Sequence, residues 1–210
     1  MPTGFSVPGL DEASAEKVRS RLQERLNALI DLGLTLKHIH WNVVGPSFIG
    51  VHEMLDPQYT AVQAMVDEVA ERIATLGGSP VGTPGNIVAK RSWDDYSVGR
   101  AMTQEHLSAL DLVYTGVVED HRKAIEEFEE EPVSQDMITT QSGLLEQFQW
   151  FVRAHLEDGT GRLVNEGATT EEEAAAMASA TPGTSVDDVP AGADGQATKR
   201  RARRKAAAKS

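Results

Sequence analysis

The sequence contains no cysteine, so disulfide frameworks and metal sites built from thiolates are excluded. It also has no apolar run that approaches the ~20 residues of a membrane-spanning helix. Residues 1–10 carry neither a basic cluster nor the hydrophobic stretch of a secretion signal. We therefore expect a cytoplasmic protein without a membrane partner.

Basic residues are scarce outside the C-terminal end. Residues 199–210 hold seven of the 20 Lys and Arg residues and none of the 32 Asp and Glu residues. The rest of the chain therefore carries a formal charge of −19, although the whole chain carries −12. An acidic body and a basic end need two separate explanations.

Hydrophobic residues recur at helical spacing in four long segments. These segments predict helices at about 11–43, 47–76, 98–130 and 133–157. Residues 77–98 are rich in Gly, Pro, Ser and Asp, and we predict a short helix there near Trp93-Asp94-Asp95-Tyr96. Four long helices with one long crossover between the second and the third predict an all-α, ferritin-like four-helix bundle.

The composition divides the chain into three parts. Residues 1–10 contain two Pro and two Gly and are predicted to form an N-terminal arm, and residues 11–160 the bundle. Residues 165–198 have almost no large apolar side chains, so they cannot offset the entropy of ordering. We therefore expect residues 161–210 to be a flexible C-terminal tail with a basic end.

Histidines and carboxylates recur at helical spacing in the second predicted helix. His52 and Asp56 are four residues apart, and so are Asp67 and Glu71, so each pair shares one helix face. Imidazole and carboxylate together suit Fe, Mn, Zn or Co. Asp56 and Asp67 are separated by about 16 Å along a helix, so one metal centre cannot use both from the same chain.

The four positions are symmetric about the point between Ala61 and Val62. A two-fold axis at that point would set His52 opposite Glu71 of a partner subunit, and Asp56 opposite the partner's Asp67. No histidine in the chain has a glutamate three residues before it, as the di-iron site inside a ferritin-like bundle requires. The pattern predicts a site completed by a dimer; the alternative is a set of polar residues on a solvated helix face.

The stretch Leu36-Lys37-His38-Ile39-His40-Trp41-Asn42-Val43-Val44-Gly45-Pro46 precedes these ligands. Together with His52-x3-Asp56-x10-Asp67-x3-Glu71 and with Phe148-Gln149-Trp150-Phe151, it resembles the Dps family. These are the DNA-binding proteins from starved cells, which form ferritin-like mini-cages. The resemblance spans about residues 5–160 and looks closest to actinobacterial members.

The resemblance implies a homododecamer built from two-fold dimers, with ferroxidase centres at the dimer interfaces. His40, His52 and Asp56 would come from one subunit, and Asp67 and Glu71 from its two-fold mate. Such proteins oxidise Fe(II), preferably with hydrogen peroxide, and store a ferric mineral. Iron is thus both the expected substrate and the expected cargo.

The resemblance also implies roles near the ligands and at the pores. Trp41 would intercept stray oxidising equivalents; the alternative is that it fills the core. Glu127 and Asp136 would line three-fold pores that admit Fe(II), or they belong to a solvated helix end. Of the other histidines, we expect His38 to pack beside the site, and His106, His121 and His155 to lie on the surface.

The basic end predicts sequence-independent, salt-sensitive DNA binding, because it carries phosphate-binding side chains without a base-reading motif. Its candidate residues are Lys199, Arg200, Arg201, Arg203, Arg204, Lys205 and Lys209. Alternatively, the tail folds back onto acidic surface. Two other readings remain: a nucleoid-associated protein that mainly compacts DNA with little iron oxidation, and a dimeric helical bundle that binds zinc.

Overall fold

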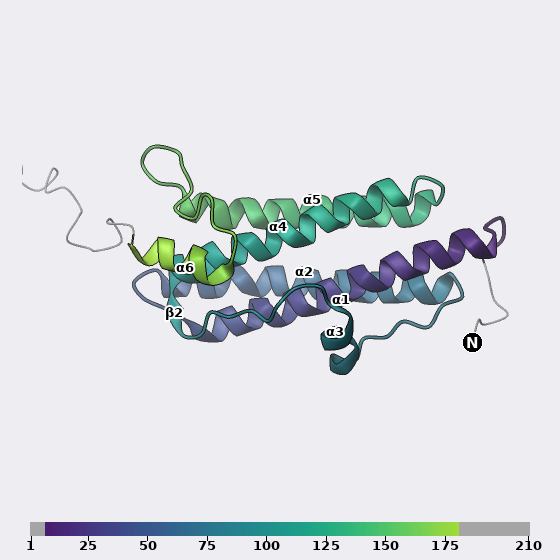
Figure 1. Cartoon of the computed structure of the whole chain (residues 1–210), viewed down its shortest axis with the longest axis horizontal. Coiled ribbons are helices and arrows are strands. Elements are labelled where there is room, and N and C mark those ends of the chain that lie inside the picture. Colours follow the sequence, from purple (N-terminus) through teal and green to yellow (C-terminus); the bar gives the residue numbers. More distant parts are fainter. Residues whose placement is uncertain (1–6, 181–210) are drawn as a thin grey trace, which may run out of the picture. The chain divides into compact units, whose positions relative to one another are not determined.

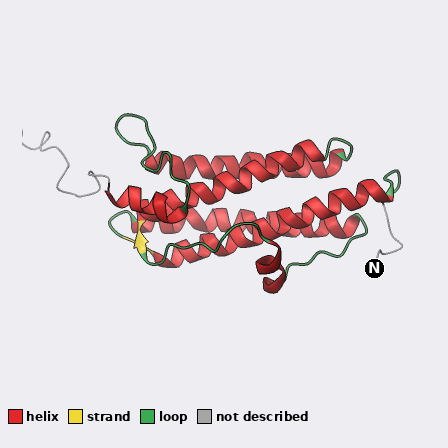
Figure 2. Ribbon diagram, viewed as in Figure 1, coloured by secondary structure: helices red, strands yellow, loops and turns green. Residues whose placement is uncertain are grey.

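The structure is a computed structural model that describes residues 7–180. Four long helices form the bundle: α1 (Glu12–Asn42), α2 (Phe48–Thr75), α4 (Thr103–Glu127) and α5 (Pro132–Leu156). In Figures 1 and 2, α1 lies beside α2 and α4 beside α5, and α1 also contacts α4. The helices begin and end within a few residues of their predicted positions, which confirms the all-α, ferritin-like bundle.

Local chemistry explains where the helices begin. The carboxylate of Asp11 accepts hydrogen bonds from the first free backbone N–H groups of α1, at Ala13 and Ser14. The carboxylate of Glu131 caps α5 in the same way by accepting from Ser134 N. Gly45 has a φ of +105° in the turn between α1 and α2, a conformation that suits glycine because it lacks a Cβ.

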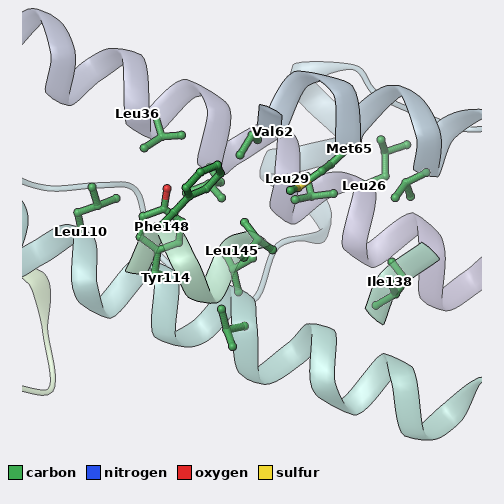
Figure 3. Close-up of a cluster of buried hydrophobic side chains, with 14 of the residues drawn as sticks. Leu26, Leu29, Leu36, Val62, Met65, Leu110, Tyr114, Ile138, Leu145 and Phe148 are labelled. Atoms are coloured by element: carbon green, nitrogen blue, oxygen red, sulfur yellow. The ribbon is translucent and has the colours of Figure 1, made fainter. Parts of the chain in front are cut away.

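A single apolar core lies between the four long helices (Figure 3). Each helix contributes a stripe of buried side chains, which matches the helical spacing in the sequence. The labelled members are Leu26, Leu29, Leu36, Val62, Met65, Leu110, Tyr114, Ile138, Leu145 and Phe148. Because these side chains point into the core, the opposite faces of α1 and α2 remain outside it.

The crossover between α2 and α4 contains the expected short helix, but in a different place. Helix α3 spans Pro84–Lys90, and residues 93–96 are not helical. Pro84 starts α3 because its fixed φ suits the first turn of a helix. Trp93 instead donates from Nε1 to Asp31 Oδ2 at 2.8 Å, which holds the crossover against α1.

A short parallel pairing joins the end of α1 to the start of α4. Strand β1 (Val43–Val44) pairs with β2 (Ala101–Met102), with Val43 opposite Ala101. The sequence did not predict this pairing, because two-residue strands have no periodicity that can be recognised. It fixes the chain directly after the last turn of α1, where His40 and Trp41 lie.

The prediction of a flexible tail from residue 161 onward is wrong for the part that the structure describes. Leu163 pairs with Glu157 in a β-bridge, and Asn165 Nδ2 donates to Asp111 Oδ2. Helix α6 (Glu171–Ala180) then buries Ala174 and Ala178. The prediction took the scarcity of large apolar side chains as a sign of disorder. Helix α6 packs through its alanines instead, which are small and favour a helix. Residues 1–6 and 181–210 lie outside the described residues.

The last point about the helices concerns their length and apolar character. Across residues 7–180, none of them is both long and apolar enough to cross a membrane.

Candidate metal centre

His40 and His52 lie against each other where α1 turns into α2. Their rings stack with a centroid separation of 3.6 Å and an interplanar angle of 21°. Each Nδ1 is held by the backbone of the other residue: His40 Nδ1 lies 3.0 Å from His52 O, and His52 Nδ1 lies 2.9 Å from His40 O. A carbonyl oxygen only accepts, so both Nδ1 atoms carry a proton. In the neutral rings, Nε2 is then the nitrogen with a free lone pair for a metal.

Asp56 brings a carboxylate to the histidine pair from the next turn of α2. Its Oδ1 lies 3.4 Å from His40 Nδ1 and 2.6 Å from Lys37 Nζ. The hydrogen bond from Lys37 holds the pKa of Asp56 below its ordinary value. The carboxylate is therefore ionised at neutral pH and suited to a cation. The structure thus brings His40, His52 and Asp56 together.

Sequence reasoning missed Lys37. It stands three residues before His40 and so shares that face of α1, a spacing that could have drawn attention to it. Its ammonium also lies 5.0 Å from the centroid of the Tyr59 ring, so the lysine is held from two sides.

The structure does not bring Asp67 and Glu71 to the histidine pair. Both are exposed on α2, one turn apart, and their carboxylates make no hydrogen bond or ion pair within residues 7–180. Within that range, moreover, no group of three or more His, Asp or Glu side chains is arranged to hold a metal ion. Within one chain the predicted ligands therefore lie in two separate sets.

Large apolar side chains are exposed near the predicted ligands. Trp41 is 73% exposed, and Leu34, two turns earlier on the same face of α1, is 63% exposed. Ile49, at the start of α2, is 56% exposed. In the single chain Trp41 is therefore not a core residue, and the surface beside the ligands has the character of an interface.

The acidic corner between α4 and α5 contains a cavity of about 210 Å³. Glu127 lines it and pairs with Arg21 at 3.4 Å, whereas Asp136 is exposed but does not line it. Glu131 also lines the cavity, yet its carboxylate is engaged by Arg72 at 2.8 Å and caps α5. Of the two predicted pore residues, only Glu127 lies at this cavity.

Two histidines expected on the surface are fully buried, so that prediction is wrong. His106 packs under Tyr96, and His121 donates from Nδ1 to Val117 O at 3.1 Å. Burial lowers the pKa of His121 to about 4. His155 is exposed, as predicted, and His38 packs against the crossover by donating from Nε2 to Val98 O at 2.9 Å.

The predicted DNA-binding residues of the basic end, from Lys199 to Lys209, lie outside the described residues. They remain a prediction from the sequence.

Several known proteins are similar to this chain in sequence and in fold. Residues 19–161 match the ferritin family, described as a ferritin-like domain. A DNA protection during starvation protein of Mycolicibacterium smegmatis is 60% identical over 174 residues, which cover 82% of this chain and 95% of the relative. The solved structure of Mycobacterium smegmatis Dps is 60% identical with a TM-score of 0.79, covering 80% of this chain and 97% of that one.

A second solved structure, DpsA14 from Streptomyces coelicolor, is 57% identical with a TM-score of 0.76. The match covers 78% of this chain and 98% of that chain. In sequence and in fold, over most of its length, the chain belongs to the Dps family of ferritin-like proteins.

Proposed function

We propose that this protein is a ferroxidase and iron-storage cage that oxidises Fe(II), preferably with hydrogen peroxide, and retains ferric mineral. The His40–His52 pair carries this proposal. Both Nδ1 atoms are held by backbone carbonyls, so two Nε2 atoms on stacked rings are available as ligands, and the Asp56 carboxylate lies on the Nδ1 side of the His40 ring. Mixed nitrogen and oxygen donors of this kind suit iron.

The second half of the site comes from a partner subunit in this proposal. The carboxylates of Asp67 and Glu71 make no hydrogen bond or ion pair within residues 7–180, and α1 exposes Leu34 and Trp41. A two-fold axis through the middle of α2 brings the partner's Asp67 and Glu71 to the histidine pair. Two identical sites then form per dimer, and six such dimers assemble the homododecamer of the family.

The chain's own residues have separate tasks in this reaction. The neutral imidazoles bind Fe(II) through Nε2, and the carboxylates neutralise the charge that increases when iron is oxidised. Trp41 stands next to the first ligand and is exposed, so it is placed to donate an electron to a stray oxidant before that oxidant escapes.

Rapid-mixing measurement of Fe(II) oxidation by hydrogen peroxide tests the function. We expect His52→Ala to lose most of the rate, because it removes a ligand from every site. His155→Ala is the matched control: that imidazole is exposed and only bonds the carbonyl of Phe151 within its own helix. Equal rates for His52→Ala and the unaltered protein would contradict the proposal.

Iron access through the acidic corner belongs to the same proposal. Carboxylates around a narrow opening raise the local concentration of cations and so increase the rate of uptake. Glu127 lines the cavity there, and Asp136 lies on the neighbouring helix. We expect Glu127→Gln and Asp136→Asn to slow ferric mineral formation more than the first turnover at the proposed iron site.

We also propose that the protein binds and protects DNA without sequence preference through its basic end. Seven Lys and Arg residues without a neighbouring acid support this, whereas the remaining acidic body repels phosphate. A cage with twelve such ends adds weak contacts by multivalency. The relative named for DNA protection during starvation is consistent with this role and with a place in the nucleoid of the cytoplasm.

Truncation after Ala197 tests DNA binding in the full assembly. Loss of gel retardation, with unchanged iron oxidation, is the expected result. Retardation that persists unchanged would contradict binding by the basic end. The second candidate function, DNA compaction with little iron oxidation, predicts the opposite result for His52→Ala: no change in any measurement.

A further inference from the structure

A partly buried tyrosine and a fully buried histidine form a pair near the end of α1 that carries the predicted ligand His40. Tyr96, in the crossover between α3 and β2, places its hydroxyl oxygen 3.0 Å from Nδ1 of His106, in the first turn of α4. The rings are nearly parallel, with an interplanar angle of 10° and centroids 6.1 Å apart. His106 has no exposed surface. Neither residue has a role in the reaction described above.

We assign the phenol as the donor and His106 Nδ1 as the acceptor, because Nδ1 is nearer to the hydroxyl, at 3.0 Å, than His106 O, at 3.4 Å. Burial, and to a smaller extent the Glu171 carboxylate, raises the pKa of Tyr96 well above its ordinary value. Burial also lowers the pKa of His106, although the backbone of Asn42 acts in the opposite direction. At neutral pH the phenol therefore keeps its proton and the imidazole remains uncharged, which leaves a base in contact with the hydroxyl group.

The pair contacts the turn of α1 that also carries the predicted ligand His40. The ring of His38 meets the Tyr96 ring edge-on, with centroids 5.7 Å apart. Asn42, whose backbone faces His106, is separated from the predicted ligand His40 only by Trp41. The crossover that carries Tyr96 runs along α1 toward β2 in Figure 1. The last turn of α1 thus presents His40 to iron while its backbone and His38 contact the tyrosine pair.

We propose that Tyr96 is an internal one-electron donor to oxidants generated at the iron site, with His106 as the acceptor of its proton. This proposal rests on the proposed function for the source of the oxidant. When Fe(II) reduces hydrogen peroxide by one electron, the products are Fe(III), hydroxide and a hydroxyl radical. An electron from Tyr96 reduces that radical to hydroxide. At the same time the phenol O–H bond breaks, and the proton moves to His106 Nδ1, leaving a neutral tyrosyl radical and an imidazolium.

The other two tyrosines of the chain lack this arrangement. Tyr114 is fully buried and donates at 2.7 Å to Gln58 Oε1, an amide oxygen that is too weak a base to take the proton. Tyr59 lies under the Lys37 ammonium, whose positive charge opposes removal of an electron from the ring. Its hydroxyl makes no hydrogen bond to any residue from 7 to 180. Tyr96 therefore differs from the other two tyrosines because its hydroxyl group contacts the His106 imidazole, a base that can accept the proton.

Freeze-quenched electron paramagnetic resonance on the assembled, full-length protein tests the proposal. Protein loaded with Fe(II) is mixed with hydrogen peroxide, and ferric absorbance is recorded in the same samples. We expect a tyrosyl signal that changes shape when the protein contains ring-deuterated tyrosine. The signal should be lost in Tyr96→Phe and retained in Tyr114→Phe and Tyr59→Phe. His106→Gln, which keeps a hydrogen-bond acceptor but removes the base, should also lose the signal.

Trp41 provides a second readout. If Tyr96 intercepts the oxidant, Tyr96→Phe should increase the fraction of oxidised Trp41 found by mass spectrometry after several turnovers, whereas Tyr114→Phe should leave it unchanged. Ferric product together with an unaltered radical signal in Tyr96→Phe, or with no tyrosyl signal in the unaltered protein, would overturn this inference alone. Absence of ferric product in every sample would overturn the proposed function as well.

Discussion

Lys37 Nζ lies 2.6 Å from Asp56 Oδ1, the same oxygen that lies 3.4 Å from His40 Nδ1. An ammonium group thus pairs with a carboxylate that the family resemblance predicts as an iron ligand. A cation that binds at Asp56 must displace Lys37 or share the carboxylate with it. If iron binds at Asp56 as proposed, Lys37 competes with it while it keeps Asp56 ionised and in place.

Replacing Lys37 with glutamine is expected to strengthen Fe(II) binding. The change removes a positive charge beside the site and the ion-pair partner of Asp56, so we expect up to about a five-fold lower Kd. Anaerobic titration of the assembled protein with Fe(II) measures it. Lys37→Arg keeps the charge and is the control. A higher Kd for Lys37→Gln would mean that the lysine positions Asp56 and does not compete with iron.

A mixture of two inactive variants is expected to recover activity if the site is shared between subunits. His52→Ala and Glu71→Gln each disable both sites of their own homodimer. In a heterodimer, one site receives both defects and the other receives none. Random reassembly of equal amounts should therefore restore about a quarter of the unaltered rate of Fe(II) oxidation.

The control for this recovery is a mixture of His52→Ala with Asp56→Asn. Both substitutions fall in the same half of the site, so every site in a heterodimer carries one of them, and no recovery is expected. Recovery in both mixtures, or in neither, would contradict a site formed by His52 of one subunit and Glu71 of the other.

The sequence predicted the bundle well because its signals are local. Helix ends follow Gly45-Pro46 and Pro132, and the apolar stripes follow helical spacing. The ligand candidates were also readable, since spacing alone places His52 and Asp56 on one face. The structure places both of them near His40, and their role as ligands stays a prediction. The pairing with Asp67 and Glu71 stays a prediction.

Other features could not be predicted because they depend on contacts between residues that are far apart in the sequence. His106 and His121 look like surface residues in a polar helix, but their neighbours come from the crossover and from other helices. Helix α6 has a composition typical of a tail, and it packs only because the bundle offers a surface that small alanines fit. Lys37 became relevant only when Asp56, nineteen residues away, was placed beside it.

His121 is expected to make the assembly sensitive to mild acid. Burial lowers its pKa in the folded protein to about 4, against an ordinary value of 6.5, so the unfolded chain binds more protons between these values. Stability should therefore fall as the pH decreases from about 6.5 to about 4, by up to about 3 kcal/mol per chain. Calorimetric unfolding should show a smaller decrease in Tm for His121→Gln than for the unaltered protein. His155→Gln should follow the unaltered protein.

Glu171 is expected to make the docking of α6 depend on pH in the opposite direction. Burial raises its pKa to about 7, and the nearby charges of Glu172 and Asp31 add to this, whereas the hydrogen bond from Ser97 N opposes it. A raised carboxyl pKa means that the docked state holds the proton more tightly. The docked state therefore becomes less stable as the pH rises from about 4.5 to about 7 and stays so above it.

Glu171→Gln cannot ionise but still accepts from Ser97, so it should keep α6 docked at any pH in this range. Hydrogen exchange of the α6 amides, compared between variants at each pH, measures the difference. We expect equal protection near pH 5 and stronger protection in Glu171→Gln at about pH 8. Glu172→Gln, at an exposed position, should have a smaller effect. Equal protection of the unaltered protein and Glu171→Gln at both pH values would show that the Glu171 charge does not oppose docking.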